Sequence, residues 1–263
     1  MINISFRGRQ LQIPQRIEEI AKGTPYLRYL ELAAMTPTDE VGRMAVRVKL
    51  LSFLLQLKTD LSLYPKDFIK EAMHRIRLTD PFIDGRGRLV TRTGTNMVPA
   101  YQGWKGPDDM LGDVDFGTFI DCETMLRAIR DTDDDDEHRR LQAEIFRKLY
   151  HTAERYPQES GSMPLLHAHA FTLFCNVTDI IRSEPVSING RDIDFSILFK
   201  ESPGETRPDD RTGWTGVALE TAETGVFGSY YAVLKANLWD VLLFLYRKKF
   251  ERMHDKTLNR FRE

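Results

Sequence analysis

The chain has 263 residues, of which 41% are hydrophobic and 29% charged, and its formal net charge is −2 at pH 7. This composition is typical of a folded globular protein, and the near-neutral charge gives no overall attraction to nucleic acid or to an anionic membrane. The two cysteines, Cys122 and Cys175, lie far apart, which favours a reducing compartment over a disulfide-bonded scaffold.

The N-terminus has the pattern of a β-hairpin. Apolar residues alternate with polar ones on both sides of Arg7-Gly8-Arg9, at Ile2, Ile4, Phe6, Leu11 and Ile13. Alternation with a period of two around a glycine turn predicts two antiparallel strands. Pro14 ends the second strand because it has no backbone N–H to donate.

Three helices are predicted between residues 24 and 78. Thr24-Pro25 and Thr36-Pro37 each combine an N-cap residue with a first-turn proline, and Pro65 precedes the third helix. In the second helix, apolar residues recur at spacings of three and four. They predict one apolar stripe in a compact helical layer, formed by Val41, Met44, Val48, Leu51 and Leu55.

Residues 79–117 are dense in Gly, Pro, Asp and Thr, with only short apolar islands. This composition predicts a long loop that carries one or two short strands, and loops of this length are often functional. The loop would separate an N-terminal part, 1–78, made of the hairpin and a helical layer, from a C-terminal helical region, 118–263. The three parts could also form one continuous domain.

The helical pattern returns at Asp115, with Thr118 or Asp121 as possible caps. The acidic run Asp133–Asp136 precedes a helix predicted to reach Tyr156, because negative charge stabilises a helix N-terminus. Residues 163–183 form the most apolar helix and are expected to lie at the centre of the core.

A second hairpin is predicted around residues 186–195, because Asn189-Gly190 favours a type I′ turn. Two C-terminal helices, about 214–223 and 230–253, would follow. The fold class predicted from these elements is mainly α, of the α+β kind, with a helical body and two small hairpins.

No catalytic residue, metal site or cofactor is predicted. His167 and His169 are two residues apart on a helix and therefore point in different directions. Asp133–Asp136 with His138 lacks the glycine and the distal glutamate of a calcium-binding EF-hand loop. One alternative stays open, a hydrolase whose dispersed site would use His167, His169 and Cys175 or nearby carboxylates.

A second alternative is a nucleic-acid-binding module. Positive charge and stackable rings occur together in the Arg86–Trp104 loop, at Arg86, Arg88, Arg92, Tyr101 and Trp104. The same residue types are also enriched at protein–protein contacts. The sequence therefore offers this loop as a weak nucleic-acid candidate.

The C-terminal helix has a broader apolar face than a helix with one buried side needs. Its apolar residues run from Tyr230 to Tyr246. Burial on two sides within the fold explains this width, and so does docking of a partner or a second subunit. The stretch Leu238–Tyr246 contains Asp240 and is too short to span a bilayer, which takes ~20 residues.

Four stretches, taken in order, resemble tail-assembly-region proteins of tailed phages and prophages, of the tail-assembly-chaperone kind. They are ISFRGRQLQIP, DFGTFIDCETMLRAI, SINGRDIDFSILF and GWTGVALETAETGVFGSYYAVLKANLWDVLLFL. The resemblance implies a non-enzymatic assembly factor or virion component, acting in the bacterial cytoplasm or in the virion. Such chaperones shield apolar helical segments of the tape-measure protein until the tail polymerises.

On this hypothesis the partner is a protein, either the tape-measure protein or another tail component, and neither a membrane nor nucleic acid is expected. The C-terminal helices would bind it. The contact residues predicted there are Trp214, Phe227, Tyr231 and Trp239.

Overall fold

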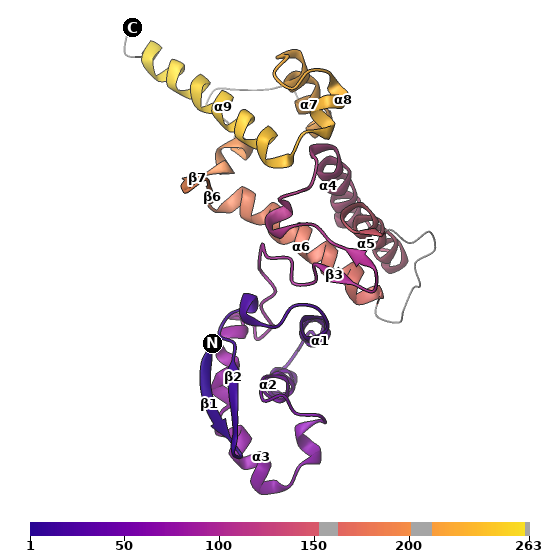
Figure 1. Cartoon of the computed structure of the whole chain (residues 1–263), viewed down its shortest axis with the longest axis vertical. Helices are drawn as coiled ribbons and strands as arrows, with labels where there is room; N and C mark the ends of the chain where they lie inside the picture. The colour runs from indigo at the N-terminus through magenta and orange to yellow at the C-terminus, as the bar shows by residue number, and fades with distance from the viewer. Residues whose placement is uncertain (153–162, 201–211, 261–263) are drawn as a thin grey trace.

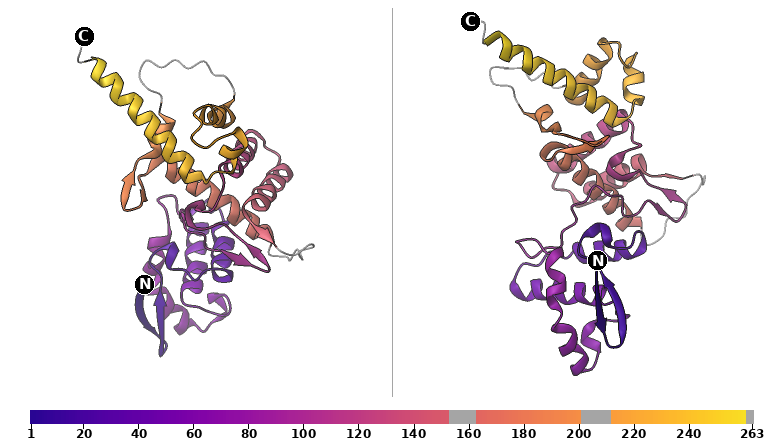
Figure 2. Two further views of the ribbon diagram at one scale, coloured as in Figure 1. Left: turned by 45° about the horizontal axis from the view of Figure 1, so that its top comes forward. Right: turned by 60° about the vertical axis from the view of Figure 1, so that its left-hand side comes forward.

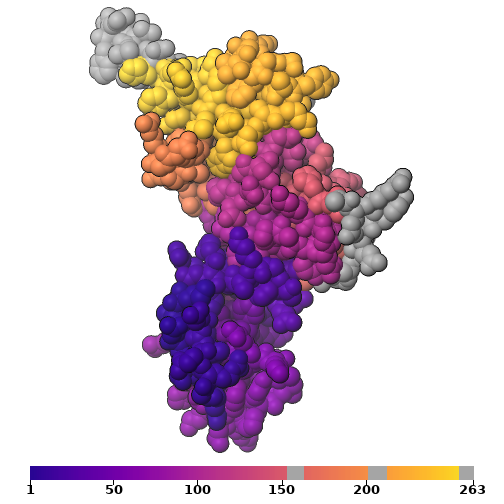
Figure 3. Space-filling model, in the orientation of Figure 1, coloured from indigo at the N-terminus to yellow at the C-terminus, as the bar shows by residue number. Residues whose placement is uncertain are grey.

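The computed structural model describes residues 1–152, 163–200 and 212–260. The protein is mainly α, with small antiparallel sheets, which confirms the predicted fold class. The molecule is elongated, with its N-terminal elements at one end, helices α4, α5 and α6 in the middle and helices α7, α8 and α9 at the other end (Figure 1). The space-filling view shows the same outline (Figure 3).

The N-terminal hairpin is confirmed. Strand β1 (Ile2–Phe6) pairs antiparallel with β2 (Arg9–Ile13), so that Phe6 lies opposite Arg9. Arg7 and Gly8 have φ angles of 50° and 75°, as a two-residue turn of type I′ requires. The side chains on one face of the hairpin are buried, namely Phe6, Leu11 and Ile13.

Three α-helices follow, α1 (Thr24–Ala33), α2 (Glu40–Leu54) and α3 (Lys66–Met73), with 3-10 helices at Ile17–Glu19, Leu61–Leu63 and Ile76–Phe82. The predicted start of the second helix is wrong. Asp39, not Thr36, is the N-cap of α2, and its carboxylate accepts a hydrogen bond of 2.7 Å from the Gly42 N–H.

The predicted apolar stripe of α2 is wrong in its first half. Val41 is 78% exposed and Met44 is 47% exposed. The residues that α2 buries are Val46, Leu50, Leu51 and Leu54. The second half of α2 carries apolar residues on two faces. The spacing of these residues therefore does not show which of the two faces stays buried in the first half of the helix.

The segment from 83 to 115 is largely irregular but packs closely against the rest of the chain. Its short strands β3 (Ala100–Tyr101) and β4 (Trp104–Lys105) form a three-stranded sheet with β5 (His151–Thr152). A 3-10 turn at Asp109–Leu111 follows. Strand β5 lies where a helix reaching Tyr156 is predicted. The predicted helix is confirmed as far as Leu149 and is wrong for residues 150–152, while residues 153–156 lie outside the described residues.

Helices α4 (Phe116–Asp131), α5 (Asp135–Leu149) and α6 (Met163–Ser183) form the middle of the molecule. The cap of α4 is Asp115, not Thr118 or Asp121, and it accepts a hydrogen bond from the Thr118 N–H. Asp134 caps α5, as the acidic run predicts. The central position of α6 is also confirmed, because nine of its residues are buried.

The second hairpin is confirmed as β6 (Val186–Ile188) and β7 (Arg191–Ile193). Asn189 and Gly190 have φ angles of 52° and 74°. A 3-10 helix (Phe195–Phe199) follows, and then α7 (Gly213–Glu223), α8 (Tyr230–Lys235) and α9 (Leu238–Arg260). Among the helices of the described residues, none combines the length and the apolar composition that crossing a bilayer requires.

The single long C-terminal helix predicted from residue 230 is wrong, because the chain breaks between α8 and α9. The Phe116 N–H donates to the Ala236 carbonyl at 2.9 Å, and the Leu238 N–H donates to the Val114 carbonyl at 3.0 Å. These bonds to a distant segment replace intrahelical ones. The Asn237 side chain then accepts a hydrogen bond from the Trp239 N–H at the start of α9.

Replacing Asp134 by Ala tests the cap of α5. The Asp134 carboxylate accepts hydrogen bonds from the N–H groups of Asp136 and Glu137, so its loss should lower the free energy of unfolding by ~1 kcal/mol. Asp133→Ala, a change in the same acidic run just outside the helix, should change it by less than ~0.5 kcal/mol. Urea denaturation measures both. Equal effects would mean that overall charge, not capping, explains the acidic run.

Candidate interaction surfaces

Two of the four aromatic residues predicted to contact a partner, Trp214 and Trp239, pack instead against other parts of the protein itself. The Trp214 ring packs edge-on against Phe116 and Phe119, at centroid distances of 5.8 Å and 5.4 Å. The Trp239 indole N–H donates to the Met110 carbonyl at 3.0 Å. Both tryptophans are partly buried. They attach α7 and α9 to the helical middle of the molecule.

Of the other two residues, Tyr231 lies on α8 and Phe227 lies in the loop between α7 and α8. Tyr231 of α8 is 77% exposed, and Phe227 packs its ring against Phe244 at 5.5 Å. Val226 and Leu219 are also exposed. These four residues, Leu219, Val226, Phe227 and Tyr231, are called the α7–α8 surface below. Figure 1 places α7 and α8 at the end of the molecule away from the N-terminal hairpin.

Two more exposed apolar side chains lie in the second half of α9. Phe250 is 56% exposed and Met253 is 45% exposed, and Tyr246 stacks on Phe250 at a centroid distance of 6.1 Å. Tyr246 also packs on Phe195 at 5.8 Å, which keeps the start of this face in contact with the 3-10 helix Phe195–Phe199, whereas both views in Figure 2 show the C-terminal end of α9 extending away from the body. The residues Tyr246, Phe250 and Met253 are called the α9 end.

The exposed first half of α2 forms a third apolar surface. An open groove of about 560 Å³ lies along it, and its lining is mainly apolar. Val41, Met44 and Val48 supply apolar side chains, while Glu40 and Asp60 place carboxylates in the lining. This feature is called the α2 groove.

The residues of the nucleic-acid candidate bind other parts of the protein. Asp84 accepts the backbone N–H groups of Arg86 and Arg88, and it pairs with the Arg88 side chain at 3.5 Å. Arg92 pairs with Asp179 at 2.9 Å and with Glu184 at the end of α6. A polyanion would therefore have to displace carboxylates from two of these three arginines.

Trp104 lies on a different element again. Its ring packs against Phe146 of α5 at a centroid distance of 4.8 Å and is partly buried. Trp104, Arg88 and Arg92 therefore contact separate parts of the protein, and their arrangement differs from the stacking platform beside a basic groove that single-stranded nucleic acid needs.

The two histidines of the hydrolase alternative contact different residues. His167 packs on Phe146 at 4.9 Å, whereas the His169 ring meets Asn96. Burial raises the pKa of Cys122 to about 12 and that of Cys175 to about 11. Both thiols are therefore protonated at neutral pH and are weak nucleophiles. Within residues 1–152, 163–200 and 212–260, no three His, Cys, Asp or Glu side chains gather as a metal site.

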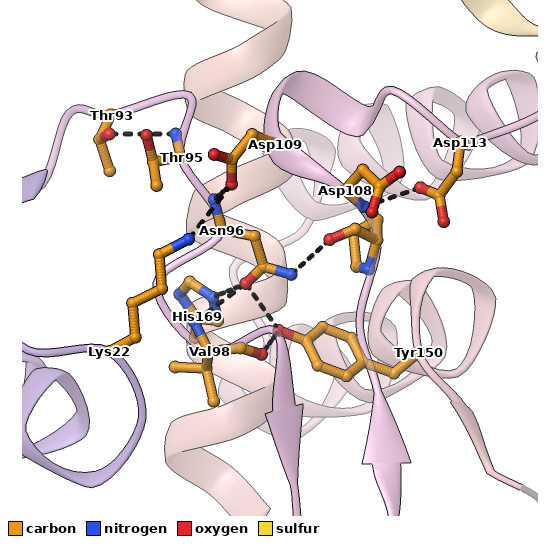
Figure 4. A network of polar contacts seen from close by, with 11 residues as sticks. Lys22, Thr93, Thr95, Asn96, Val98, Asp108, Asp109, Asp113, Tyr150 and His169 are labelled. Carbon is orange, nitrogen blue, oxygen red and sulfur yellow. Dashed lines mark hydrogen bonds and ion pairs between the residues drawn. The ribbon is translucent and has the colours of Figure 1, made fainter.

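Asn96 is the centre of a buried polar network that sequence reasoning missed (Figure 4). Its Nδ2 donates to the Pro107 carbonyl at 2.6 Å, and its Oδ1 accepts from the Val98 N–H at 3.0 Å. His169 Nε2 lies 3.0 Å from the same Oδ1, and the Tyr150 hydroxyl donates to the Val98 carbonyl at 2.8 Å. In the sequence, Asn96 looks like any polar loop residue.

The network determines the state of His169. Because the Asn96 Oδ1 can only accept, the His169 Nε2 carries the proton of a neutral ring. The His169 Nδ1 is buried, with no hydrogen-bond partner among the described residues. Desolvation lowers the pKa of His169 to about 3, because a charged imidazolium would be buried there and its Nδ1–H would find no acceptor among the described residues.

Comparison with known proteins finds no family model, no curated protein and no solved structure that matches the chain.

The raised pKa values of the two thiols can be tested by labelling. A thiol whose pKa rises from 9 to about 11 has roughly 100-fold less thiolate at neutral pH. A maleimide should therefore label Cys122 and Cys175 at least tenfold more slowly in the native protein than in urea. Single Cys→Ala variants assign the two rates. Rapid labelling of one native thiol would instead support a nucleophilic role.

His169 should make the folded state sensitive to acid. The unfolded chain takes up a proton near pH 6.5, whereas folded His169 does so only near pH 3. Stability from this group is therefore complete above pH 6.5 and is lost as the pH falls, by about 1.4 kcal/mol per pH unit. His169→Gln keeps a side-chain N–H donor without titrating and should lose this part of the pH dependence.

Urea denaturation at several pH values measures the effect, and His74→Gln at an exposed position is the control. Parallel pH profiles for the wild type and His169→Gln would contradict the buried neutral imidazole.

Proposed function

We propose that the chain is a non-enzymatic interaction protein that binds another protein through the α7–α8 surface. The observation that carries the proposal is the exposure of Tyr231, with Val226 and Leu219 also exposed nearby in the chain. Contiguous exposed apolar patches are typical of binding sites, and these three side chains lie on α7, on α8 and in the loop between them. Tyrosine in particular supplies a large contact area with little loss of side-chain entropy.

Aromatic contacts hold the elements of the α7–α8 surface in place, as suits a binding site. Trp214 anchors α7 on α4, and Phe227 fixes the loop between α7 and α8 on Phe244 of α9. The two glycines of that loop, Gly225 and Gly228, have φ angles of 73° and 88°, which other residues rarely adopt. A surface held in this way loses little conformational freedom when a partner binds.

The resemblance to tail-assembly-region proteins supplies the biological role in this proposal. The protein would act as an assembly factor or virion component of a tailed phage or prophage, in the bacterial cytoplasm or in the virion. Its partner would be a helix-rich tail component such as the tape-measure protein. An apolar helix of that partner would pack against Tyr231 and Val226 and be shielded from water.

The two alternatives have less support in the contacts. The side chains of Arg88 and Arg92 are paired with carboxylates, which weakens the nucleic-acid hypothesis. The raised pKa values of Cys122 and Cys175 weaken the hydrolase hypothesis. Neither of these two observations argues against a protein partner at the α7–α8 surface.

A pull-down tests the proposal. The tagged protein is expressed together with its neighbouring genes, and the co-purifying proteins are identified by mass spectrometry. The double variant Val226→Asp/Tyr231→Glu should reduce recovery of a stoichiometric partner at least tenfold, because it places charge in the contact (tenfold is ~1.4 kcal/mol). Its melting temperature should stay near that of the wild type, since both side chains are exposed.

Leu63→Asp is the matched control, because Leu63 is exposed near α2, in the N-terminal half of the molecule. It makes the same kind of change and should leave partner recovery unaltered. Equal recovery with all three proteins would remove the α7–α8 surface as the binding site. Recovery of no protein partner at all would remove the assembly role.

A further inference from the structure

The N-terminal hairpin leaves one side of strand β2 (Arg9–Ile13) without a neighbouring strand. Its sheet has the order β1–β2, and no other strand of the described residues joins it. Figure 1 shows the hairpin at the outer margin of the N-terminal elements. We propose that this edge of β2 pairs antiparallel with the same edge of a second copy of the chain. The contact uses no residue of the α7–α8 surface, so it stands or falls independently of the proposed function.

The backbone of β2 presents unpaired hydrogen-bonding groups along this edge. Phe6 and Arg9 flank the two-residue turn as a hydrogen-bonded pair, and successive pairs of an antiparallel ladder alternate between bonded and non-bonded. Gln10 and Gln12 are therefore non-bonded positions, whose N–H and C=O groups point away from β1. Both residues are exposed, and their backbone groups have no partner within residues 1–152, 163–200 and 212–260. Such a row of groups is a template for another strand.

Two copies of this edge are complementary to each other under two-fold symmetry. When Gln10 of one copy lies opposite Gln12 of the other, the two residues exchange both backbone hydrogen bonds, and the symmetry-related pair does the same. Leu11 then lies opposite its own counterpart at the two-fold axis. A register that places Gln10 opposite Gln10, or Gln12 opposite Gln12, keeps one complete bonded pair instead of two. The ladder ends at Pro14, which has no N–H to donate.

The side chains of β2 also favour this pairing. Exposed edge strands commonly carry charged residues, which keep copies of a protein apart, whereas residues 10–13 are Gln-Leu-Gln-Ile and carry no charge. Leu11 and Ile13 face the core. Gln10 of one copy and Gln12 of the other become cross-strand neighbours on the solvent-facing side, where their amides can hydrogen-bond to each other. Arg9 lies opposite Ile13 in this register, so the two Arg9 side chains stay at opposite ends of the ladder.

The pairing should stop at a dimer. A two-fold contact uses the same edge in both copies, so neither β2 edge remains open. The other edge of the hairpin is occupied at Ser5, whose carbonyl accepts a hydrogen bond of 3.1 Å from the Arg75 guanidinium. Arg75 also lies over the Phe6 ring, 5.1 Å from its centroid. The product is one four-stranded sheet in which the two β2 strands are central and the two β1 strands are outermost.

Two charge variants of the full chain test the contact by sedimentation velocity over a range of concentrations. Gln10→Lys/Gln12→Lys places like charges opposite each other across the two-fold axis, and Gln10→Glu/Gln12→Glu does the same with the opposite sign. Each variant alone should dimerise at least tenfold more weakly than the wild type. Both positions are exposed, so both proteins should fold, which circular dichroism and thermal melting verify.

The matched control is Asn3→Lys/Ser5→Lys. Asn3 lies opposite Gln12, and Ser5 lies opposite Gln10, within the same hairpin. Both control residues are exposed and share the solvent-facing side of the sheet with the two glutamines, but they belong to β1. The control variant should therefore dimerise as the wild type does. Equal weakening by the β1 and β2 changes would overturn the proposal, because added charge alone would then explain the effect.

The decisive sample is an equimolar mixture of the Lys and Glu variants of β2. Each Lys side chain then lies opposite a Glu side chain of the other copy, so the mixture should form a 1:1 dimer that weakens as salt is added. A wild type that stays monomeric at every concentration would overturn the proposal. So would folded charge variants that associate as strongly as the wild type, or that do not combine when mixed.

Discussion

The connecting segment from residue 90 to 99 lies between the N-terminal elements and the helical middle of the molecule, where its backbone polar groups have to find partners within the protein. The Tyr29 hydroxyl of α1 donates to the Val90 carbonyl at 2.5 Å, and the Gly23 N–H donates to the Met97 carbonyl at 2.7 Å. From the other side, Asn176 of α6 donates to the Thr91 carbonyl at 2.7 Å. The segment thus joins α1 to α6.

Asn96 makes this junction specific. Its buried amide bonds to the segment itself, to the stretch after β4 and to α6, and a half-satisfied amide at that depth would be costly. The fit is close on all sides, because a Cβ at Gly106 would lie 2.6 Å from the Tyr150 ring and 2.7 Å from the Asn96 Nδ2. Only glycine allows this approach of the chain. The same network fixes the tautomer of the His169 ring, and burial keeps the ring neutral.

Local signals in the sequence predicted the fold class and several elements. Arg7-Gly8 and Asn189-Gly190 form turns through their own backbone preferences, and the acidic run before α5 supplies its cap, so these features need no distant partner. The break between α8 and α9 and the strand β5 depend on bonds to residues more than 40 positions away. No local pattern at Asn237 or His151 reports such bonds, so both elements were predicted as helix.

The candidate surfaces were harder to predict than the fold, because an apolar residue type does not reveal whether its neighbours cover it. Trp214 and Tyr231 both belong to the aromatic C-terminal region, yet the first packs on Phe116 and the second faces solvent. The difference follows from segment 112–116, which leads into α4, bonds to the α8–α9 junction and brings Phe116 to Trp214. Sequence spacing within α7 and α8 contains no information on that contact.

The junction at Asn96 also separates the exposed faces of the molecule. The α2 groove lies on one side of it, and the α7–α8 surface and the α9 end lie on the other. Packing between α1 and α6, including Tyr26 against His169 at 5.4 Å, holds these parts in one arrangement. The two ends of the molecule are thus joined through packed side chains and through the hydrogen bonds of Asn96 and Asn176, both of which involve α6.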